Sequence, residues 1–315
     1  MKKYILVSEK KIEKKLQLDK FYKFIFLIFT ILSASIVVIV IFFIVMKGTV
    51  SFTSGGYVNN KLFKLNVLDF ITGFRFSYGE GIYGALFLVI NTIYVTSLAL
   101  LLAIPTSIFT GIFISKVAPS ILKKVLNYSI EMLVAVPSVI FGLFGLGVIS
   151  PMIKSFGATS LSSTLAGVLV LSLMILPTLT MMNVTAFNSV PKSLINGSLA
   201  LGATKTETNF KVVLKSAKSG IFSGIILSTG RALGEATAVS MVFGNSSGWD
   251  FSLANPFNLL GTTSTLTSTM LLEIHEASGF NYNIRFSLGI LLMILILVSN
   301  LLLSFIKRRM KNWKE

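Results

Sequence analysis

The chain has 315 residues, of which 53% are hydrophobic and only 13% are charged, and its mean hydropathy is +0.82. This composition excludes a soluble domain and indicates a protein that crosses a membrane several times. The absence of cysteine excludes disulfides, thiolate metal sites and a cysteine nucleophile, and the net charge of +16 must be interpreted from where the charges lie.

Apolar blocks long enough to span a bilayer divide the chain. A basic tail, 1–23, precedes a first block at 24–46, which is longer than the core of a signal peptide and is predicted to be retained as a span. A polar segment at 47–82, predicted to be extracytoplasmic, leads into a core at 83–306, and a second tail occupies 307–315. The six predicted transmembrane helices are 24–46, 83–115, 125–150, 161–186, 219–243 and 286–306. We therefore predict an all-α polytopic membrane protein.

Lysine and arginine are concentrated on one side of this topology. The N-terminal tail carries eight, the loop 116–124 three, the loop 188–218 five and the C-terminal tail five, whereas the opposite side carries five in total. The positive-inside rule therefore places both termini in the cytoplasm. The basic excess reflects this orientation and attraction to the anionic inner leaflet, so the predicted partner is the lipid bilayer and not a nucleic acid.

One proline falls in each of the second, third and fourth predicted spans, at Pro105, Pro137 and Pro177. Such residues are tolerated in membranes where neighbouring helices or hydroxyl groups take up the freed carbonyl. The second span is long as well, so a tilt or kink at Pro105 is expected.

The cytoplasmic loop 188–218 is predicted to hold two short helices. The first is a run from Ser193 that ends at Gly202, a residue well placed to stop a helix. The second runs from Lys205 to Lys218 and leads directly into the next span. A connector that needs no partner is usually much shorter, so this elbow is predicted to dock into a groove on another protein.

Arg231 and Glu235 lie four residues apart inside the otherwise apolar span 219–243. A charge in the middle of a spanning helix costs roughly 2.5–3.5 kcal/mol on insertion scales, so it persists mainly where it pairs, faces water or has a function. The spacing predicts that both side chains lie on one helix face. They can form a structural ion pair, or the guanidinium can bind an anion while Glu235 neutralises it in the empty state.

The cytoplasmic loop resembles the EAA loop of ABC importer permeases, whose pattern is E-A-A-x3-G-x9-I-x-L-P. The glycine and two apolar positions are kept, whereas the glutamate, both alanines and the final proline are replaced, the last by Lys215. The matching positions are Gly202, Val212 and Leu214, whereas Asn196 stands in place of the glutamate and Gly197 and Ser198 in place of the alanines. The resemblance implies that this loop couples to an ABC ATPase, with Leu199, Leu201 and Val212 as buried contacts in the ATPase cleft.

Two spans resemble the phosphate-specific ABC transporter permeases of the C-subunit type, the PstC-like members of the MetI-like family. Gly230 to Val239 with Gly244-Asn245 carries the resemblance in the fifth span, and Glu131 to Gly145 in the third. The stretch Ser189 to Thr204 fits as well, so the likeness covers about 83–306. It implies the type I ABC importer permease fold in a bacterial inner membrane.

The resemblance also implies a function and a set of partners. Arg231 and Glu235 would contribute to the phosphate path, and this chain would form half of the pore beside a second, PstA-like permease subunit. An ABC ATPase dimer and an extracytoplasmic phosphate-binding protein would complete the importer. No G-x4-G-K-[ST] phosphate loop occurs in the sequence, so ATP is expected on the ATPase, and this chain is predicted to be non-catalytic, without a cofactor or metal.

Three alternatives remain open at the level of the sequence. Another oxyanion, such as sulfate or molybdate, pairs with arginine as phosphate does. A non-transporting scaffold or sensor subunit would use the charged pair and the loop for assembly alone. A secondary transporter is disfavoured, because no inverted repeat is apparent.

Overall fold

The computed structural model describes residues 2–58, 61–158, 160–244 and 259–312. Within these ranges, five helical runs are long and apolar enough to cross a membrane. They are α1 (Lys2–Thr53), α3 (Leu86–Ile112) with η1 (Phe113–Val117), α5 (Ser138–Phe144) with η2 (Gly145–Ile149) and α6 (Ser150–Ser155), α7 (Thr164–Asn188) and α14 (Gly279–Asn312). The predicted all-α class is confirmed, and each run overlaps one of the six predicted spans.

The predicted fifth span differs from the expectation of one continuous helix. It forms two pieces, α11 (Lys218–Gly234) and α12 (Thr237–Phe243). The chain leaves the helical conformation at Glu235, where φ is −71° and ψ is 121°. Neither piece alone has the length of a spanning helix, which needs about 20 residues.

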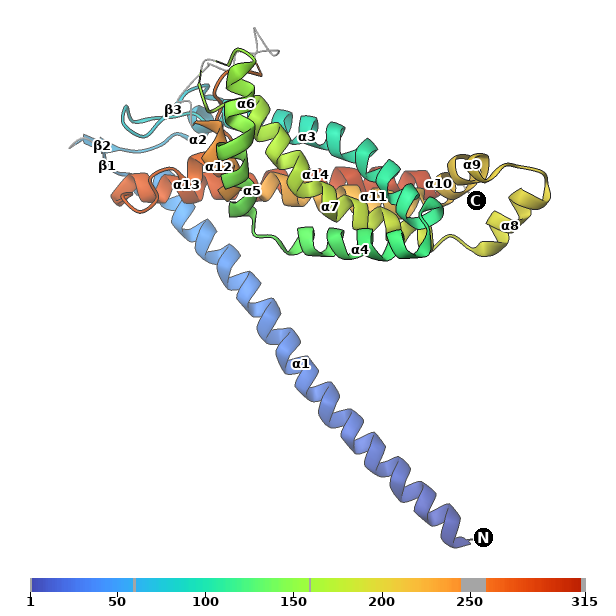
Figure 1. Ribbon diagram of the computed structural model, residues 1–315. Helices are drawn as coiled ribbons and strands as arrows, with labels where there is room; N and C mark the ends of the chain where they lie inside the picture. Colours follow the sequence, from blue (N-terminus) through green and yellow to red (C-terminus); the bar gives the residue numbers. More distant parts are fainter. Residues whose placement is uncertain (1, 59–60, 159, 245–258, 313–315) are drawn as a thin grey trace.

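The predicted third span is also divided. It begins in α4 (Ser120–Ala135), which ends before Val136, a residue in extended conformation with ψ of 127°. Pro137 follows, and its ring disfavours the helical conformation of the residue before it. The chain therefore turns between α4 and α5 (Figure 1). Pro105 and Pro177, in contrast, lie inside α3 and α7 without ending either helix.

The centre of the bundle is α7, which packs between α3 and α11. Both contacts are close because each includes a glycine. A Cβ atom at Gly111 of α3 would lie 2.9 Å from the Cβ of Asn183, and one at Gly224 of α11 would lie 2.9 Å from the Cβ of Met182. The apolar core around these contacts comprises Val95, Ala99, Ala103, Val168, Leu171, Met174, Ile175, Leu179, Ala232, Val239 and Phe243.

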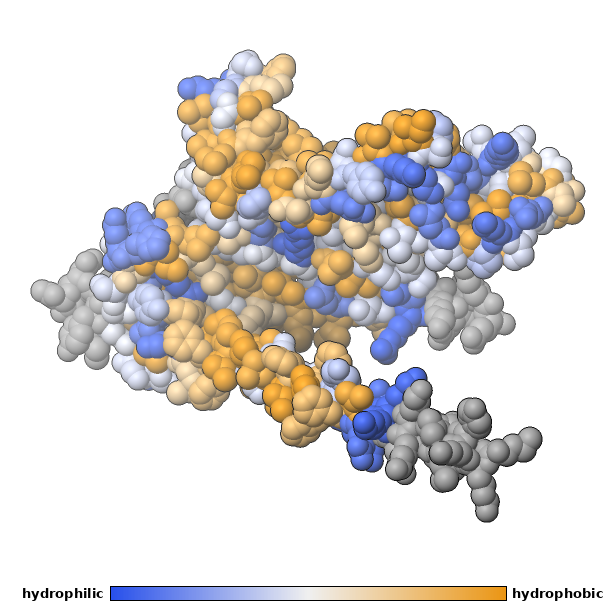
Figure 2. All heavy atoms as spheres, turned by 60° about the horizontal axis from the view of Figure 1, so that its bottom comes forward, coloured by the Kyte–Doolittle hydropathy of each residue, from blue (hydrophilic) through white to orange (hydrophobic). Residues whose placement is uncertain are grey.

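The first helix, α1, leaves this bundle at an angle and contacts it mainly through its C-terminal turns (Figure 1). There Gly48 approaches α14 closely, and the Ser287 hydroxyl donates to the Gly48 carbonyl at 2.7 Å. Apolar side chains cover the helix along most of its length, and hydrophilic ones gather toward its N-terminal part (Figure 2). This surface suits lipid contact, with the basic tail at the membrane edge.

At one end of the bundle lies the predicted extracytoplasmic segment, which is more structured than expected. It contains the hairpins β1 (Gly56–Val58) with β2 (Lys61–Phe63) and β3 (Phe76–Ser77) with β4 (Ile82–Tyr83), separated by α2 (Val67–Thr72). The short helix α13 (Leu266–Leu271) lies at the same end (Figure 1). Aromatic side chains, among them Phe70, Phe76, Tyr83 and Phe280, form its core.

Arg285, at the first turns of α14, ties this end together. Its side chain is only 4% exposed, and its guanidinium lies 4.1 Å from the centre of the Tyr78 ring. Nη1 donates to the Asn281 carbonyl at 2.6 Å, and Nη2 donates to the carbonyl of Leu272. Arg285 is therefore a structural link between α13, α14 and the β3–β4 connection.

Candidate functional site

Arg231 occupies the last turn of α11, where it faces α7 and is half-buried. Nη1 donates to the hydroxyl of Thr178 at 2.7 Å, and Thr178 follows directly after Pro177. This hydrogen bond uses one of the five guanidinium donors. Nothing acidic neutralises the cation, because the one ion pair among the described residues is Lys211–Glu207.

Glu235 lies four residues further along the chain, and its side chain does not pair with Arg231. Its Oε1 accepts a hydrogen bond from the backbone N–H of Ala238 at 3.0 Å, so the carboxylate caps the start of α12. The predicted placement of both charges on one helix face assumes a continuous helix, and the break at Glu235 removes that condition. In this conformation Arg231 has no acidic partner in the part of the chain that the structure describes, and Glu235 is bound to the backbone.

Glu235 also lines a narrow cleft together with four threonine side chains. These come from α3 and from the start of α13, and they are Thr92, Thr96, Thr265 and Thr267. The Thr92 hydroxyl accepts a hydrogen bond from the Leu266 N–H at 3.0 Å and so joins the two elements. The remaining lining residues are apolar, and sequence reasoning missed this cleft. The available signal was the spacing of Thr92 and Thr96, which places two hydroxyls on one face of an apolar helix.

The predicted coupling loop lies at the end of the bundle opposite the hairpins (Figure 1). It folds as α8 (Lys192–Ala200), α9 (Lys205–Glu207), η3 (Thr208–Val213) and α10 (Leu214–Ser216). Gly202 ends α8 as predicted, with φ of +84°. Gly202 N–H donates to Leu199 O at 3.0 Å and Ala203 N–H donates to Ser198 O at 3.2 Å, which is the pattern of a Schellman cap.

The residues singled out in this loop fall into two groups. Asn196, Gly197, Leu199 and Leu201 are exposed, and Leu201 is 91% exposed. Val212 and Leu214 are half-buried, Leu214 against the core around Phe187, whereas their neighbour Val213 is fully buried. The Ser198 and Thr208 hydroxyls lie 3.0 Å apart and join α8 to η3. The structure thus leaves α8 as the face free for a partner and uses the second helical stretch mainly to anchor the loop.

Glu207 stabilises the elbow between the two stretches. Its N–H donates to the Thr204 hydroxyl, and its carboxylate accepts from the Thr204 N–H at 3.1 Å and from Lys211 Nζ at 3.1 Å. The bond from the Thr204 backbone, followed by that from Lys211, lowers the pKa of Glu207 to about 2 from an ordinary value near 4.5.

This arrangement predicts a pH dependence confined to strongly acidic solution. Because the folded pKa is lowered, the contribution of Glu207 to the capped state is complete above its ordinary pKa and is lost as the pH falls toward about 2. A carbon-13 NMR titration of the full chain, with the signal assigned through Glu207→Gln, measures this pKa. Lys211→Gln is expected to raise the pKa of Glu207. Lys205→Gln is the control, because Lys205 lies in the same helix as Glu207, α9, but has no hydrogen bond to its carboxylate among the described residues. A pKa at the ordinary value would contradict the capping geometry.

Comparison with known proteins shows which family the chain resembles. Residues 103–312 match the family described as "Binding-protein-dependent transport system inner membrane component". The "Probable ABC transporter permease protein YqgH" of Bacillus subtilis is 36% identical, over 85% of this chain and 84% of the relative. The "Phosphate transport system permease protein PstC" of Pasteurella multocida is 34% identical, over 72% of this chain and 77% of the relative.

A solved structure supports the fold. A chain of the MetNI methionine ABC transporter in an inward-facing conformation aligns with a TM-score of 0.53 at 16% identity, over 72% of this chain and 94% of that one. At this identity the likeness concerns the fold alone, which is that of type I ABC importer permeases. The chain therefore belongs to the family of binding-protein-dependent transport system inner membrane components, as a PstC-like, non-catalytic permease subunit of an ABC transporter.

Proposed function

We propose that this chain forms half of the translocation pore of an ATP-driven phosphate importer. The observation that carries the proposal is Arg231, a half-buried guanidinium inside the bundle without an acidic partner among the described residues. An unpaired charge at such a position is costly, so it is retained where an anion arrives to meet it. Relatives named as phosphate permeases make phosphate the favoured anion.

The chemistry around Arg231 suits an oxyanion in passage. Four of its N–H donors have no partner among the described residues, and Thr178 fixes the guanidinium without neutralising it. A planar fork can hold two oxygens of a phosphate at once. The Glu235 carboxylate, held at the start of α12, would repel the same anion and so limit how tightly the pore binds it.

Movement of the anion requires energy from another subunit, and we propose that this subunit docks on α8. Leu194, Leu199 and Leu201 are exposed on or next to this short helix, whose end is fixed by Gly202. An apolar helix face presented on a rigid elbow fits a groove on a partner. We propose that an ABC ATPase dimer supplies this groove and moves the spans as rigid bodies between two states.

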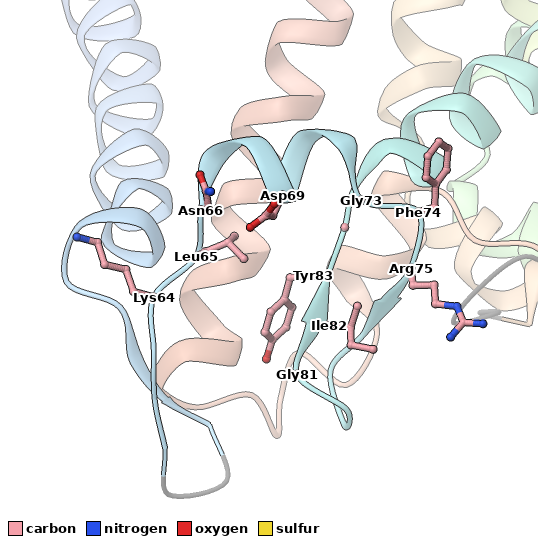
Figure 3. Close-up of a pocket in the computed structure, with 11 residues that line it drawn as sticks. Lys64, Leu65, Asn66, Asp69, Gly73, Phe74, Arg75, Gly81, Ile82 and Tyr83 are labelled. Atoms are coloured by element: carbon pink, nitrogen blue, oxygen red, sulfur yellow. The ribbon is translucent and has the colours of Figure 1, made fainter.

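The opposite end offers a surface for delivery of the anion. A hollow of about 650 Å³ lies between α2 and the β3–β4 hairpin. Lys64 and Arg75 stand at its two sides, with Asp69 and Tyr83 between them (Figure 3). We propose that this end receives the phosphate-binding protein, while a second, PstA-like permease completes the pore.

The decisive test is uptake by proteoliposomes that contain the assembled transporter. We expect radiolabelled phosphate to accumulate only with ATP, and Leu201→Glu to reduce that uptake at least about tenfold, because a charge buried at an interface costs several kcal/mol. Leu161→Glu, an equal change at an exposed site on the other end, is the matched control for association of the ATPase with this chain, which it should leave unchanged.

Each remaining outcome has a defined meaning. Equal displacement of labelled phosphate by sulfate or molybdate would favour the other oxyanion. Normal association of the ATPase without any ATP-driven uptake would favour a scaffold or sensor subunit. Full uptake by Leu201→Glu would contradict the docking role of α8.

A further inference from the structure

A second basic site lies where α11 and α14 meet at the cytoplasmic end of the bundle. The two helices pack along their length and leave a pocket of about 380 Å³ at this end. Its lining consists of Ser219, Ser223, Ile226, Ser304, Lys307 and Arg308. Three hydroxyls and two cations thus face one cavity, and none of the lining residues carries a carboxylate.

The hydrogen bonds of this pocket orient its donors. Lys307 Nζ donates to the Ser223 hydroxyl at 2.7 Å, and the Ser223 hydroxyl donates to the Ser219 carbonyl at 2.8 Å. The ammonium group is held at the seam between the helices and keeps two further donors. Arg308 is exposed and has no hydrogen-bond or ion-pair partner among the described residues. Such a set of donors without a carboxylate among the lining residues suits a group with several anionic oxygens.

The surroundings of the pocket are those of a membrane interface. Leu301, Phe305 and Leu227, from the same two helices, are exposed apolar side chains, 62%, 66% and 56% exposed respectively. The basic residues continue toward the C-terminus, where the positive-inside rule places the inner leaflet. A basic pocket between helices on the cytoplasmic side, with apolar side chains around it, is the kind of site that holds a lipid headgroup.

This pocket is separate from the candidate translocation site. Arg231 and Ser223 are on the same helix, and eight residues at 1.5 Å each place them about 12 Å apart along its axis. The role proposed for Arg231 therefore does not account for the pocket.

We propose that this pocket binds a phosphoryl oxyanion, supplied by an anionic phospholipid of the inner leaflet in preference to free phosphate. Lys307 and Arg308 contact the anionic oxygens, the Ser219 and Ser304 hydroxyls donate to the same group, and the acyl chains lie against the apolar surface beside it. Ser223 positions the Lys307 ammonium group. A bound headgroup bridges α11 and α14, so it fixes the cytoplasmic end of the helix that carries Arg231.

The test uses native mass spectrometry to identify the lipids that the purified full chain retains. The chain is taken from bilayers of mixed phosphatidylglycerol and phosphatidylcholine. We expect Lys307→Gln/Arg308→Gln to reduce the preference for phosphatidylglycerol about tenfold, given the attraction of each basic residue for an anionic surface. Lys215→Gln/Arg309→Gln is the matched control, because it removes two cationic side chains from the same end without touching the pocket. Size-exclusion profiles and circular dichroism establish that both variants are folded.

A second arm identifies the source of the phosphoryl group. Binding of radiolabelled inorganic phosphate is measured in phosphatidylcholine alone, in an Arg231→Ala background that removes the candidate translocation site. If phosphate binding is lost only in Lys307→Gln/Arg308→Gln and the chain shows no lipid preference, the site stands and free phosphate is its ligand. Equal losses in the lining and control variants, or no binding in either arm, would overturn the proposal.

Discussion

Replacement of Arg231 by alanine is expected to reduce ATP-driven phosphate uptake by roughly ten- to a hundredfold. A hydrogen bond to a charged group contributes about 1.5–3 kcal/mol, and the guanidinium offers more than one to a phosphate. Among the described residues the one hydrogen-bond or ion-pair partner of this side chain is the Thr178 hydroxyl, so within that part of the chain its removal frees no buried carboxylate. Uptake of radiolabelled phosphate by the assembled transporter, with protein abundance measured in the same membranes, provides the result.

Three further substitutions separate anion binding from a structural role. Arg231→Lys retains the charge without the planar fork and is expected to remain impaired. Thr178→Val removes the positioning hydrogen bond and is expected to have a smaller effect. Glu235→Gln keeps an oxygen that can accept from Ala238 N–H and so isolates the carboxylate charge. Normal uptake in Arg231→Ala, Arg231→Lys and Glu235→Gln together would leave only a structural role for these residues.

Sequence reasoning succeeded where one local rule decides the structure. Apolar length gave the membrane class, because the thickness of the bilayer imposes the length of a spanning helix directly. The orientation from lysine and arginine stays a prediction. Gly202 could be identified as a helix stop, since a residue at positive φ after a helix is most often glycine. Arg231 could be singled out because a charge within an apolar block is rare, and its role in the phosphate path stays a prediction.

The relation between Arg231 and Glu235 could not be obtained in the same way. Spacing along the sequence gives a relation in space only if the helix is continuous. Gly234, the last residue of α11, is a weak sign of the break, because glycine is also frequent inside membrane-spanning helices. Glu235 is neither proline nor glycine, yet its side chain caps the next helix and stabilises the interruption. The threonine cleft was missed for a related reason, because it joins Thr92 to Thr265 through contacts between distant segments. The hairpins of the 47–82 segment likewise depend on long-range packing against Phe280 of α14.

The same break makes the packing of α12 critical, and Gly167→Ala is expected to be strongly destabilising. A Cβ atom at Gly167 would lie 1.7 Å from Cε1 of Phe243, a ring that is fully buried at the end of α12. The ring cannot move without displacing its neighbours in a close-packed core, and such overpacking costs about 1–3 kcal/mol or more. The thermal stability of the purified full chain should fall accordingly, and uptake should fall with it because α12 begins beside Glu235.

A double substitution distinguishes this clash from a general intolerance of α7 to change. Phe243→Leu alone removes ring atoms and leaves a cavity, so it is itself expected to destabilise the protein. In Gly167→Ala/Phe243→Leu the added methyl group enters the space that the ring vacates, and the combined loss should be smaller than the sum of the single losses. Gly147→Ala is the matched control, since a Cβ there meets nothing within 4 Å and should leave stability nearly unchanged. Additive losses would show that Gly167 and Phe243 do not contact each other in the folded protein, and the position of α12, with Glu235 at its start, would have to be revised.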